Sequence, residues 1–191
     1  MANKTKPARG RFKLRRWEII VLVVIGLGVL WAVWETDSAG DHQASFDGYL
    51  RQGGARLAGI QTVPDGGNAH VANAVYGTEF PTTGPHDPTW INPGVYSREQ
   101  SPAKLVHSLE HGMIVIYYDD PGDETLRILR GWAKLYPGPW SGVVVAKKNG
   151  LGRTIVLSAW RNLLRQETFD PAMAAAFVDR FRGRGPENPV R

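Results

Sequence analysis

The chain has 191 residues, of which 23 are Lys or Arg and 18 are Asp or Glu, and it contains no cysteine. Its length allows one ordinary domain with an appendage and excludes two large domains. The lack of cysteine excludes disulfides, thiol catalysis, haem attachment through C-x-x-C-H and thiolate-bound metal. Any metal must therefore be held by histidine, carboxylate, tyrosine, methionine or backbone ligands.

The excess of positive charge is confined to the N-terminus. Residues 1–16, MANKTKPARGRFKLRR, carry seven of the 23 basic side chains and no acidic one. The rest of the chain has 16 basic and 18 acidic side chains, a formal charge of −2. A basic tail before a slightly acidic body argues against a nucleic-acid-binding surface, so we expect no nucleic acid as a partner.

An uncharged apolar run follows the basic tail. Residues 17–34, WEIIVLVVIGLGVLWAVW, contain one charge, at Glu18, and have tryptophans at both ends. As a helix this run would be about 27 Å long, close to the roughly 30 Å hydrocarbon core of a bilayer. We therefore predict a transmembrane helix over 17–34 in the inner (cytoplasmic) membrane, with the lipid bilayer as a partner. The positive-inside rule puts residues 1–16 in the cytoplasm as a basic tail, and the C-terminal domain in the periplasm or outside the cell.

A cleaved signal peptide is the alternative interpretation of the same residues. It is disfavoured because the basic region is long and the apolar run ends in tryptophans rather than small residues. The best cleavage site, near Ser38 and Ala39, is poor. The prediction is thus a retained, single-pass anchor.

The remaining chain divides into three segments by composition. Residues 35–75 are a polar, glycine-containing connector with a short helix expected near 44–52. Residues 76–183 carry the apolar periodicity of a folded extracytoplasmic domain. The composition of residues 184–191, rich in Gly, Pro and charge, predicts a disordered tail.

The elements predicted within the domain give its fold class. An irregular, proline-rich segment comes first, because its prolines forbid a regular helix or a central strand. Helices and strands then follow at 103–110 (helix), 113–118 (strand), 123–135 (helix), 142–147 (strand), 154–160 (strand) and 171–181 (helix). The residues at 149–152, NGLG, predict a hairpin loop between the second and third strands. This order predicts an α+β fold with a small, mostly antiparallel sheet and helices packed on one side of it.

The residues that carry chemistry lie where the first helix ends. His107, Glu110 and His111 form an H-x-x-E-H pattern, and residues three and four apart share one face of a helix. His86 ends the rigid loop PTTGPH. Three histidines from one helix and one loop are a suitable ligand set for zinc or copper. The alternative is structural: His107 packs or caps, and His111 interacts with the helix dipole.

These motifs resemble those of a known family. The segments EFPTTGPH, W, GVY and KLVHSLEHGMIVIYY, spread over residues 76–160, are similar to the uncharacterised bacterial, membrane-anchored family called domain of unknown function 3105. The resemblance implies that His86, His107, Glu110 and His111 belong to one motif set. It adds His70, in NAHVAN, as a further candidate ligand.

Three functions remain open from the sequence. The first is a membrane-anchored, metal-binding domain, holding copper or zinc through His70, His86, His107, Glu110 and His111, in metal handling or as an accessory subunit of a membrane complex. The second is a structural subunit of such a complex, in which the histidines and Glu110 form a hydrogen-bonded cluster. The third is a metal-dependent hydrolase, with Glu110 as the catalytic base.

Overall fold

The computed structural model describes residues 40–54 and 57–191, and these residues belong to one unit of the chain. The predicted basic tail (1–16) and the predicted membrane helix (17–34) lie outside the described residues. Within residues 40–54 and 57–191, no helix is long and apolar enough to span a bilayer. The part of the predicted connector that is described contains a helix at 40–53, where the sequence predicted a short one.

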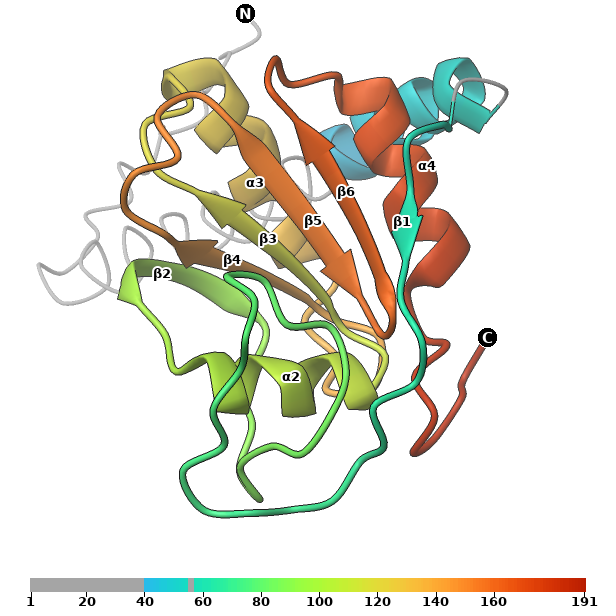
Figure 1. The fold of residues 1–191 in the computed structure, drawn as a ribbon. Coiled ribbons are helices and arrows are strands. Elements are labelled where there is room, and N and C mark those ends of the chain that lie inside the picture. The colour runs from blue at the N-terminus through green and yellow to red at the C-terminus, as the bar shows by residue number, and fades with distance from the viewer. Residues whose placement is uncertain (1–39, 55–56) are drawn as a thin grey trace, which may run out of the picture. The chain divides into compact units, whose positions relative to one another are not determined.

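The domain is an α+β fold built on one six-stranded mixed sheet (Figure 1). The strands lie in the order β1-β6-β5-β3-β4-β2. Their bounds are β1 Gln61–Thr62, β2 Gly94–Glu99, β3 Ile114–Tyr118, β4 Val143–Lys147, β5 Ile155–Ala159 and β6 Asn162–Gln166. The pairs β1–β6, β6–β5 and β5–β3 are antiparallel, whereas β3–β4 and β4–β2 are parallel. The sheet is therefore mixed, where the sequence predicted a mostly antiparallel one.

The parallel half of the sheet follows from one helix. Helix α3 (Asp123–Leu135) carries the chain from the end of β3 back to the start of β4, so the two strands run in the same direction. β3 consequently lies between β4 and β5. The predicted hairpin between β4 and β5 is wrong, because the loop at 149–152 joins two strands that do not pair.

Helices cover both faces of the sheet. Helix α2 (Pro102–Glu110) lies on one face, and α3, α4 (Pro171–Phe181) and the helix at 40–53 lie on the other (Figure 1). β3 shows why: Ile114 and Ile116 pack with α3 and α4, whereas Val115 and Tyr117 pack with α2. Both sides of this strand are apolar, so both need cover. The prediction that the helices lie on one side of the sheet was wrong.

The face covered by α3 and α4 contains the larger apolar core. Trp132 of α3 is 2% exposed and makes an edge-on contact with Phe46 at 5.4 Å between ring centroids. Phe177 of α4 and Leu129 of α3 are fully buried in the same cluster. Three-residue and four-residue spacing of apolar side chains, as at 129 and 132, places them on the face of α3 that meets the sheet.

Pattern reasoning missed three strands: the two edge strands, β1 and β2, and the inner strand β6. Among the described strands β2 pairs with β4 alone, and it begins directly after Pro93; an edge strand tolerates neighbouring prolines. β6 is joined to β5 by a two-residue turn in which Arg161 has φ 63°. Tight turns of this kind usually carry Gly or Asn, and the arginine therefore concealed the hairpin.

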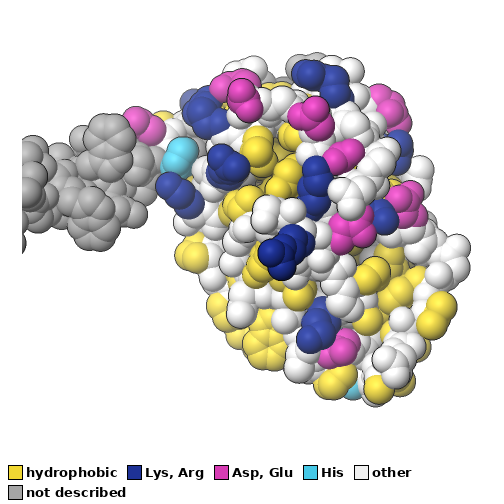
Figure 2. All heavy atoms as spheres, turned by 90° about the vertical axis from the view of Figure 1, so that its left-hand side faces the viewer, with side chains coloured by type: hydrophobic (Ala, Val, Ile, Leu, Met, Phe, Trp, Pro, Cys, Tyr) yellow, Lys and Arg dark blue, Asp and Glu magenta, His cyan; other side chains and the backbone are white. Residues whose placement is uncertain are grey.

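Charged side chains are mixed on the surface of the sheet edge formed by β2. Figure 2 shows Lys and Arg interspersed with Asp and Glu on this face, with hydrophobic side chains between them. Several of these charges pair locally, such as Lys147 with Asp119. The face has no broad area of a single charge.

Candidate metal centre

The C-terminal end of α2 is closed by a glycine motif. Gly112 has φ +87°, its N–H donates to the Leu109 carbonyl, and the Met113 N–H donates to the Ser108 carbonyl. This pair of bonds is the Schellman motif, which ends a helix at a left-handed residue. Its consequence is that the chain turns directly from His111 into β3, and the last turn of α2 is held rigidly against the sheet.

A proline-rich loop lies against that last turn. The Ser108 hydroxyl accepts from the Ile91 N–H at 3.0 Å and lies 2.9 Å from the Ile91 carbonyl, which ties the loop to α2. Upstream, the His86 N–H donates to the Ala69 carbonyl and the Val71 N–H to the His86 carbonyl. These bonds form an isolated parallel bridge between His70 and His86. The loop and the connector thus bring their two histidines to the end of α2.

Four side chains meet there, and we call them the inner group: His70, His86, His107 and Glu110. Their potential ligand atoms all lie within 4.8 Å of one another. The Glu110 carboxylate oxygen Oε2 is 3.0 Å from His86 Nε2 and 3.6 Å from His70 Nε2. His86, His107 and Glu110 are buried, whereas the His70 side chain is 46% exposed, so the group opens to solvent at His70.

Two of these histidines have their ring orientation set by the backbone. His86 Nδ1 lies 2.8 Å from the Gly84 carbonyl, and His107 Nδ1 lies 2.7 Å from the Asp87 carbonyl. A carbonyl oxygen only accepts, so in each ring Nδ1 carries the proton. In the neutral form of each ring, Nε2 then carries the lone pair. His86 Nε2 faces Glu110, and His107 Nε2 faces Glu187. Metal-binding histidines commonly show this arrangement.

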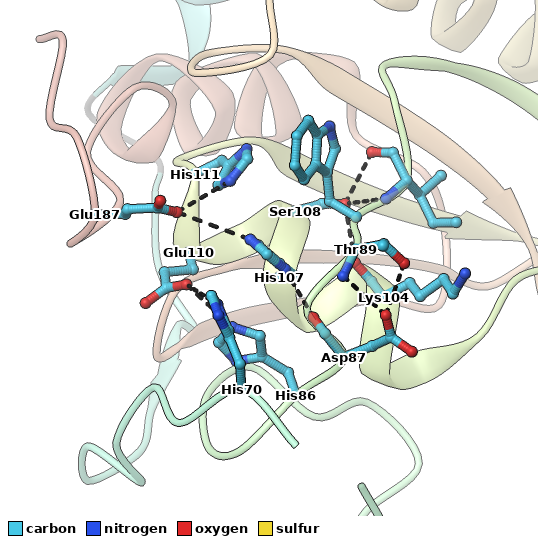
Figure 3. A network of polar contacts seen from close by, with 12 residues as sticks. His70, His86, Asp87, Thr89, Lys104, His107, Ser108, Glu110, His111 and Glu187 are labelled. Atoms are coloured by element: carbon cyan, nitrogen blue, oxygen red, sulfur yellow. Dashed lines mark hydrogen bonds and ion pairs between the residues drawn. The ribbon is translucent and has the colours of Figure 1, made fainter. Parts of the chain in front are cut away.

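A second set of side chains, which we call the outer group, shares one residue with the first. His107, His111 and Glu187 have their ligand atoms within 4.8 Å of one another. His111 Nε2 is 3.0 Å from Glu187 Oε2, and His107 Nε2 is 3.8 Å from the same oxygen. Figure 3 shows His107 between Glu187 on one side and the His70 and His86 rings on the other.

Aromatic rings surround the outer group and control its protonation. The centroid of the His111 ring lies 4.6 Å from that of Trp90 and 4.2 Å from that of Trp140. Burial lowers the pKa of His111, although the nearby Glu187 carboxylate acts to raise it. Burial also lowers the pKa of His107. Both rings are therefore neutral at pH 7 and can offer a lone pair to a metal. His111 Nδ1 makes no well-formed hydrogen bond within the described part of the chain, although the Pro139 carbonyl also acts to raise the pKa of this ring.

All five residues predicted from the sequence lie in this region, but they do not form one ligand set. His70, His86, His107 and Glu110 share the inner group, whereas His111 belongs with His107 to the outer group. The carboxylate of Glu110 lies among the nitrogen atoms of the inner group, as a ligand would.

Glu187 is the residue that sequence reasoning missed. It lies in the segment 184–191, for which composition predicted disorder. In the structure the Gly183 N–H donates to the Gly112 carbonyl at 2.8 Å, and the Glu187 N–H approaches the Glu110 carbonyl at 3.4 Å. The only signal in the sequence was the pair of glycines at 183 and 185, which permit a close backbone approach.

The fold and the site together define a small α+β domain with a histidine- and glutamate-rich centre on the α2 face of its sheet. The model of the family described as Protein of unknown function (DUF3105) matches residues 70–191, more than half of the chain, so the chain belongs to this family. The match begins at His70 and includes Glu187, so it covers both groups. The resemblance inferred from the sequence motifs is confirmed. No curated protein and no solved structure matches the chain.

Proposed function

We propose that this chain is a single-pass, membrane-anchored protein whose extracytoplasmic domain binds one zinc or copper ion through the inner group. Three imidazole nitrogens and one carboxylate oxygen would form the ligand set. The ion would serve metal handling or a larger membrane complex of which this chain is an accessory subunit.

The observation that carries the proposal is the contact between His86 and Glu110. Nδ1 of His86 donates its proton to the Gly84 carbonyl, so in the neutral form of the ring Nε2 is an acceptor. It lies 3.0 Å from a carboxylate oxygen, which is also an acceptor. Two buried acceptors at this distance repel unless a cation lies between or beside them. A metal ion bound to both would satisfy the contact, and a proton would be the alternative.

The ligand atoms of the inner group would need to move only slightly to bind one ion. Around a tetrahedral ion with bonds of about 2.0–2.2 Å, ligand atoms lie roughly 3.4 Å apart. The measured separations of 3.0 and 3.6 Å from Glu110 Oε2 already bracket this value. His70 is the exposed member, so it is the side chain with most freedom to move toward the ion.

The chemistry of the ligands favours two metals. A site of imidazole and carboxylate without thiolate suits Zn²⁺ and Cu²⁺, and both bind neutral histidine. Met113 is fully buried in the apolar cluster between α2 and the sheet, so it packs as a core residue. The placement outside the cytoplasm rests on the sequence of residues 1–34.

A hydrogen-bonded structural cluster is the second candidate, and one observation favours it. If a proton lies between His86 and Glu110, their 3.0 Å separation is an ordinary charge-assisted hydrogen bond. The cluster would then join the loop to α2 without a metal. The chain would act as a structural subunit of a membrane complex.

Metal analysis of the purified protein separates the two candidates. The full-length chain, without a histidine tag, would be purified in detergent, titrated with Zn²⁺ or Cu²⁺ and desalted, and its metal content measured by mass spectrometry. We expect one equivalent in the wild type, no metal in His107→Ala, and weaker binding, with less metal retained after desalting, in Glu110→Gln. His42→Ala is the matched control, because His42 lies on the helix at 40–53, against α3. A wild-type protein that retains neither metal would reject the metal site and favour the structural cluster.

A further inference from the structure

We infer that the inner and outer groups are two alternative positions for a single metal ion, which moves between them while it stays bound to His107. This inference rests on the proposed function and adds Glu187 and His111 as a second ligand set. In the move, the bonds to His70, His86 and Glu110 are exchanged for bonds to His111, Glu187 and one water molecule, so the ion keeps four ligands. The oxidation state of the metal does not change.

His107 makes the two positions mutually exclusive. Its Nδ1 donates to the Asp87 carbonyl at 2.7 Å, so only Nε2 has a lone pair to offer. His107 is a member of both groups, and its Nε2 lies 3.8 Å from Glu187 Oε2 in the outer group. One lone pair binds one ion, so the two groups together hold one equivalent rather than two.

The outer group has the features of a built site. His111 is 2% exposed and its Nε2 faces the Glu187 carboxylate at 3.0 Å. Trp90 and Trp140 both contact the ring and reduce its access to water. The Glu187 side chain is 40% exposed and therefore connects this buried imidazole pair with solvent.

Backbone contacts of the C-terminal segment hold Glu187 in place. At Gly185 an added Cβ would come within 2.0 Å of the Glu110 carbonyl oxygen, so only glycine allows the segment to lie this close to α2. Beyond Glu187, the Val190 N–H donates to the Gly183 carbonyl, and Arg191 pairs with Asp179 at 2.7 Å. The segment is thus closed on itself, with Glu187 at its turn, beside the two histidines.

Two positions that share a ligand suit a protein that receives and releases its metal. An ion in the inner group would have four protein ligands, three of them buried, and a fully coordinated ion of this kind exchanges slowly, as in structural zinc sites. The outer group, with its partly exposed Glu187 carboxylate, offers a route for exchange in which the ion keeps its bond to His107 at every stage. We therefore assign the outer group as the position from which the ion exchanges with a metal donor or acceptor.

The test is a zinc titration of the full-length protein and variants that disable each group separately. Stoichiometry and dissociation constant would be measured by competition with a chromophoric chelator. Glu110→Gln and His86→Ala disable the inner group, and Glu187→Gln disables the outer group. His42→Ala is again the control, and circular dichroism checks that each variant folds.

We expect the wild type, the Glu187→Gln protein and the His42→Ala protein to bind one equivalent. The inner-group variants should also bind one equivalent, at least tenfold more weakly. The double variants Glu110→Gln/Glu187→Gln and His86→Ala/Glu187→Gln, and the single variant His107→Ala, should bind none. Zinc transfer to the chelator should be slower for Glu187→Gln than for the wild type.

Three results would overturn the inference, and they differ from a failure of the proposed function. Two equivalents in the wild type would show independent sites. No binding by folded Glu110→Gln and His86→Ala proteins would show that only the inner group binds. Transfer at an unchanged rate in Glu187→Gln would remove the exchange role of the outer group. No binding by the wild type, by contrast, would reject the metal site altogether.

Discussion

The two faces of the sheet are built by different forces. Against α3 and α4 the sheet buries a core of aliphatic and aromatic side chains, among them Trp132, Phe46 and Phe177. Against α2 the apolar cluster is smaller, and beyond it lies a layer in which loops are held by hydrogen bonds to Ser108, His86 and other polar groups.

The α3 face therefore contributes most of the stability of this small domain, whereas the α2 face carries the candidate metal centre. Burial of apolar surface stabilises the α3 face without directional requirements, at roughly 25 cal/mol per Å². The α2 face uses directional hydrogen bonds, which contribute less on average but set the orientation of each imidazole ring. A metal centre needs that orientation. Substitutions on the α3 face should therefore affect folding, and those on the α2 face should affect the site.

The largest effect is expected for Trp132→Ala on the α3 face. This ring is 2% exposed, and its loss leaves a cavity that costs about 3–5 kcal/mol of unfolding free energy. Urea denaturation followed by circular dichroism would measure it. Trp90→Ala is the matched change on the α2 face: Trp90 is 41% exposed, so we expect a much smaller loss. Equal losses for the two tryptophans would contradict the division between the faces.

An intermediate effect is expected for Ser108→Ala. The partly buried Ile91 N–H loses its acceptor, which costs about 1 kcal/mol. Chemical denaturation gives the stability change, and a zinc titration should show weaker binding because the loop is no longer fixed to α2.

Ser158→Ala provides the control for this change. Ser158 is also buried, on β5, but its hydroxyl has no hydrogen-bond partner among the described residues. Its removal should leave stability unchanged or slightly raised. A cost for Ser158→Ala as large as that for Ser108→Ala would show that volume, rather than hydrogen bonding, governs both positions.

A smaller, local effect is expected for Gly185→Ala. The new Cβ would meet the Glu110 carbonyl and the Gly112 nitrogen, so the C-terminal segment should detach. Because this segment is terminal, we expect a global cost of about 1 kcal/mol or less. Hydrogen exchange at the Gly183 amide, which is bonded to Gly112, should accelerate. Gly77→Ala is the control, because a Cβ at Gly77 would have no atom within 4 Å of it. An unchanged rate of hydrogen exchange at the Gly183 amide in Gly185→Ala would show that the segment stays bound to α2 and would contradict this prediction.

The smallest effect is expected from pH on the metal-free protein. Burial lowers the pKa values of His107 and His111 from 6.5, the value of a free histidine. Below pH 6.5 the unfolded chain therefore binds more protons at these two residues than the folded chain does. Stability from these residues is therefore present above pH 6.5 and declines as the pH falls below 6.5. Thermal unfolding in the presence of a chelator would measure the decline. The His107→Gln/His111→Gln variant should show a flatter profile, and a flat wild-type profile would contradict the lowered pKa values.

Much of the secondary structure could be predicted from local pattern. Helices α3 and α4 have the predicted bounds, 123–135 and 171–181, because apolar spacing and a proline near the helix start are local signals. β6 and β2 were missed, since the turn at Arg161 and the prolines before Gly94 disguise them. The pairing of β3 with both β4 and β5 depends on contacts distant in the sequence, which no local pattern encodes.

The same division holds for the site. Sequence alone determined that His107, Glu110 and His111 share the end of one helix, because helical geometry relates residues three and four apart. It also indicated that His86 and His70 belong with them, through the family motifs. Only the tertiary structure decided that these residues separate into two groups that share His107. It also supplied Glu187, because backbone contacts at Gly112 and Gly185 bring the C-terminal segment to the end of α2.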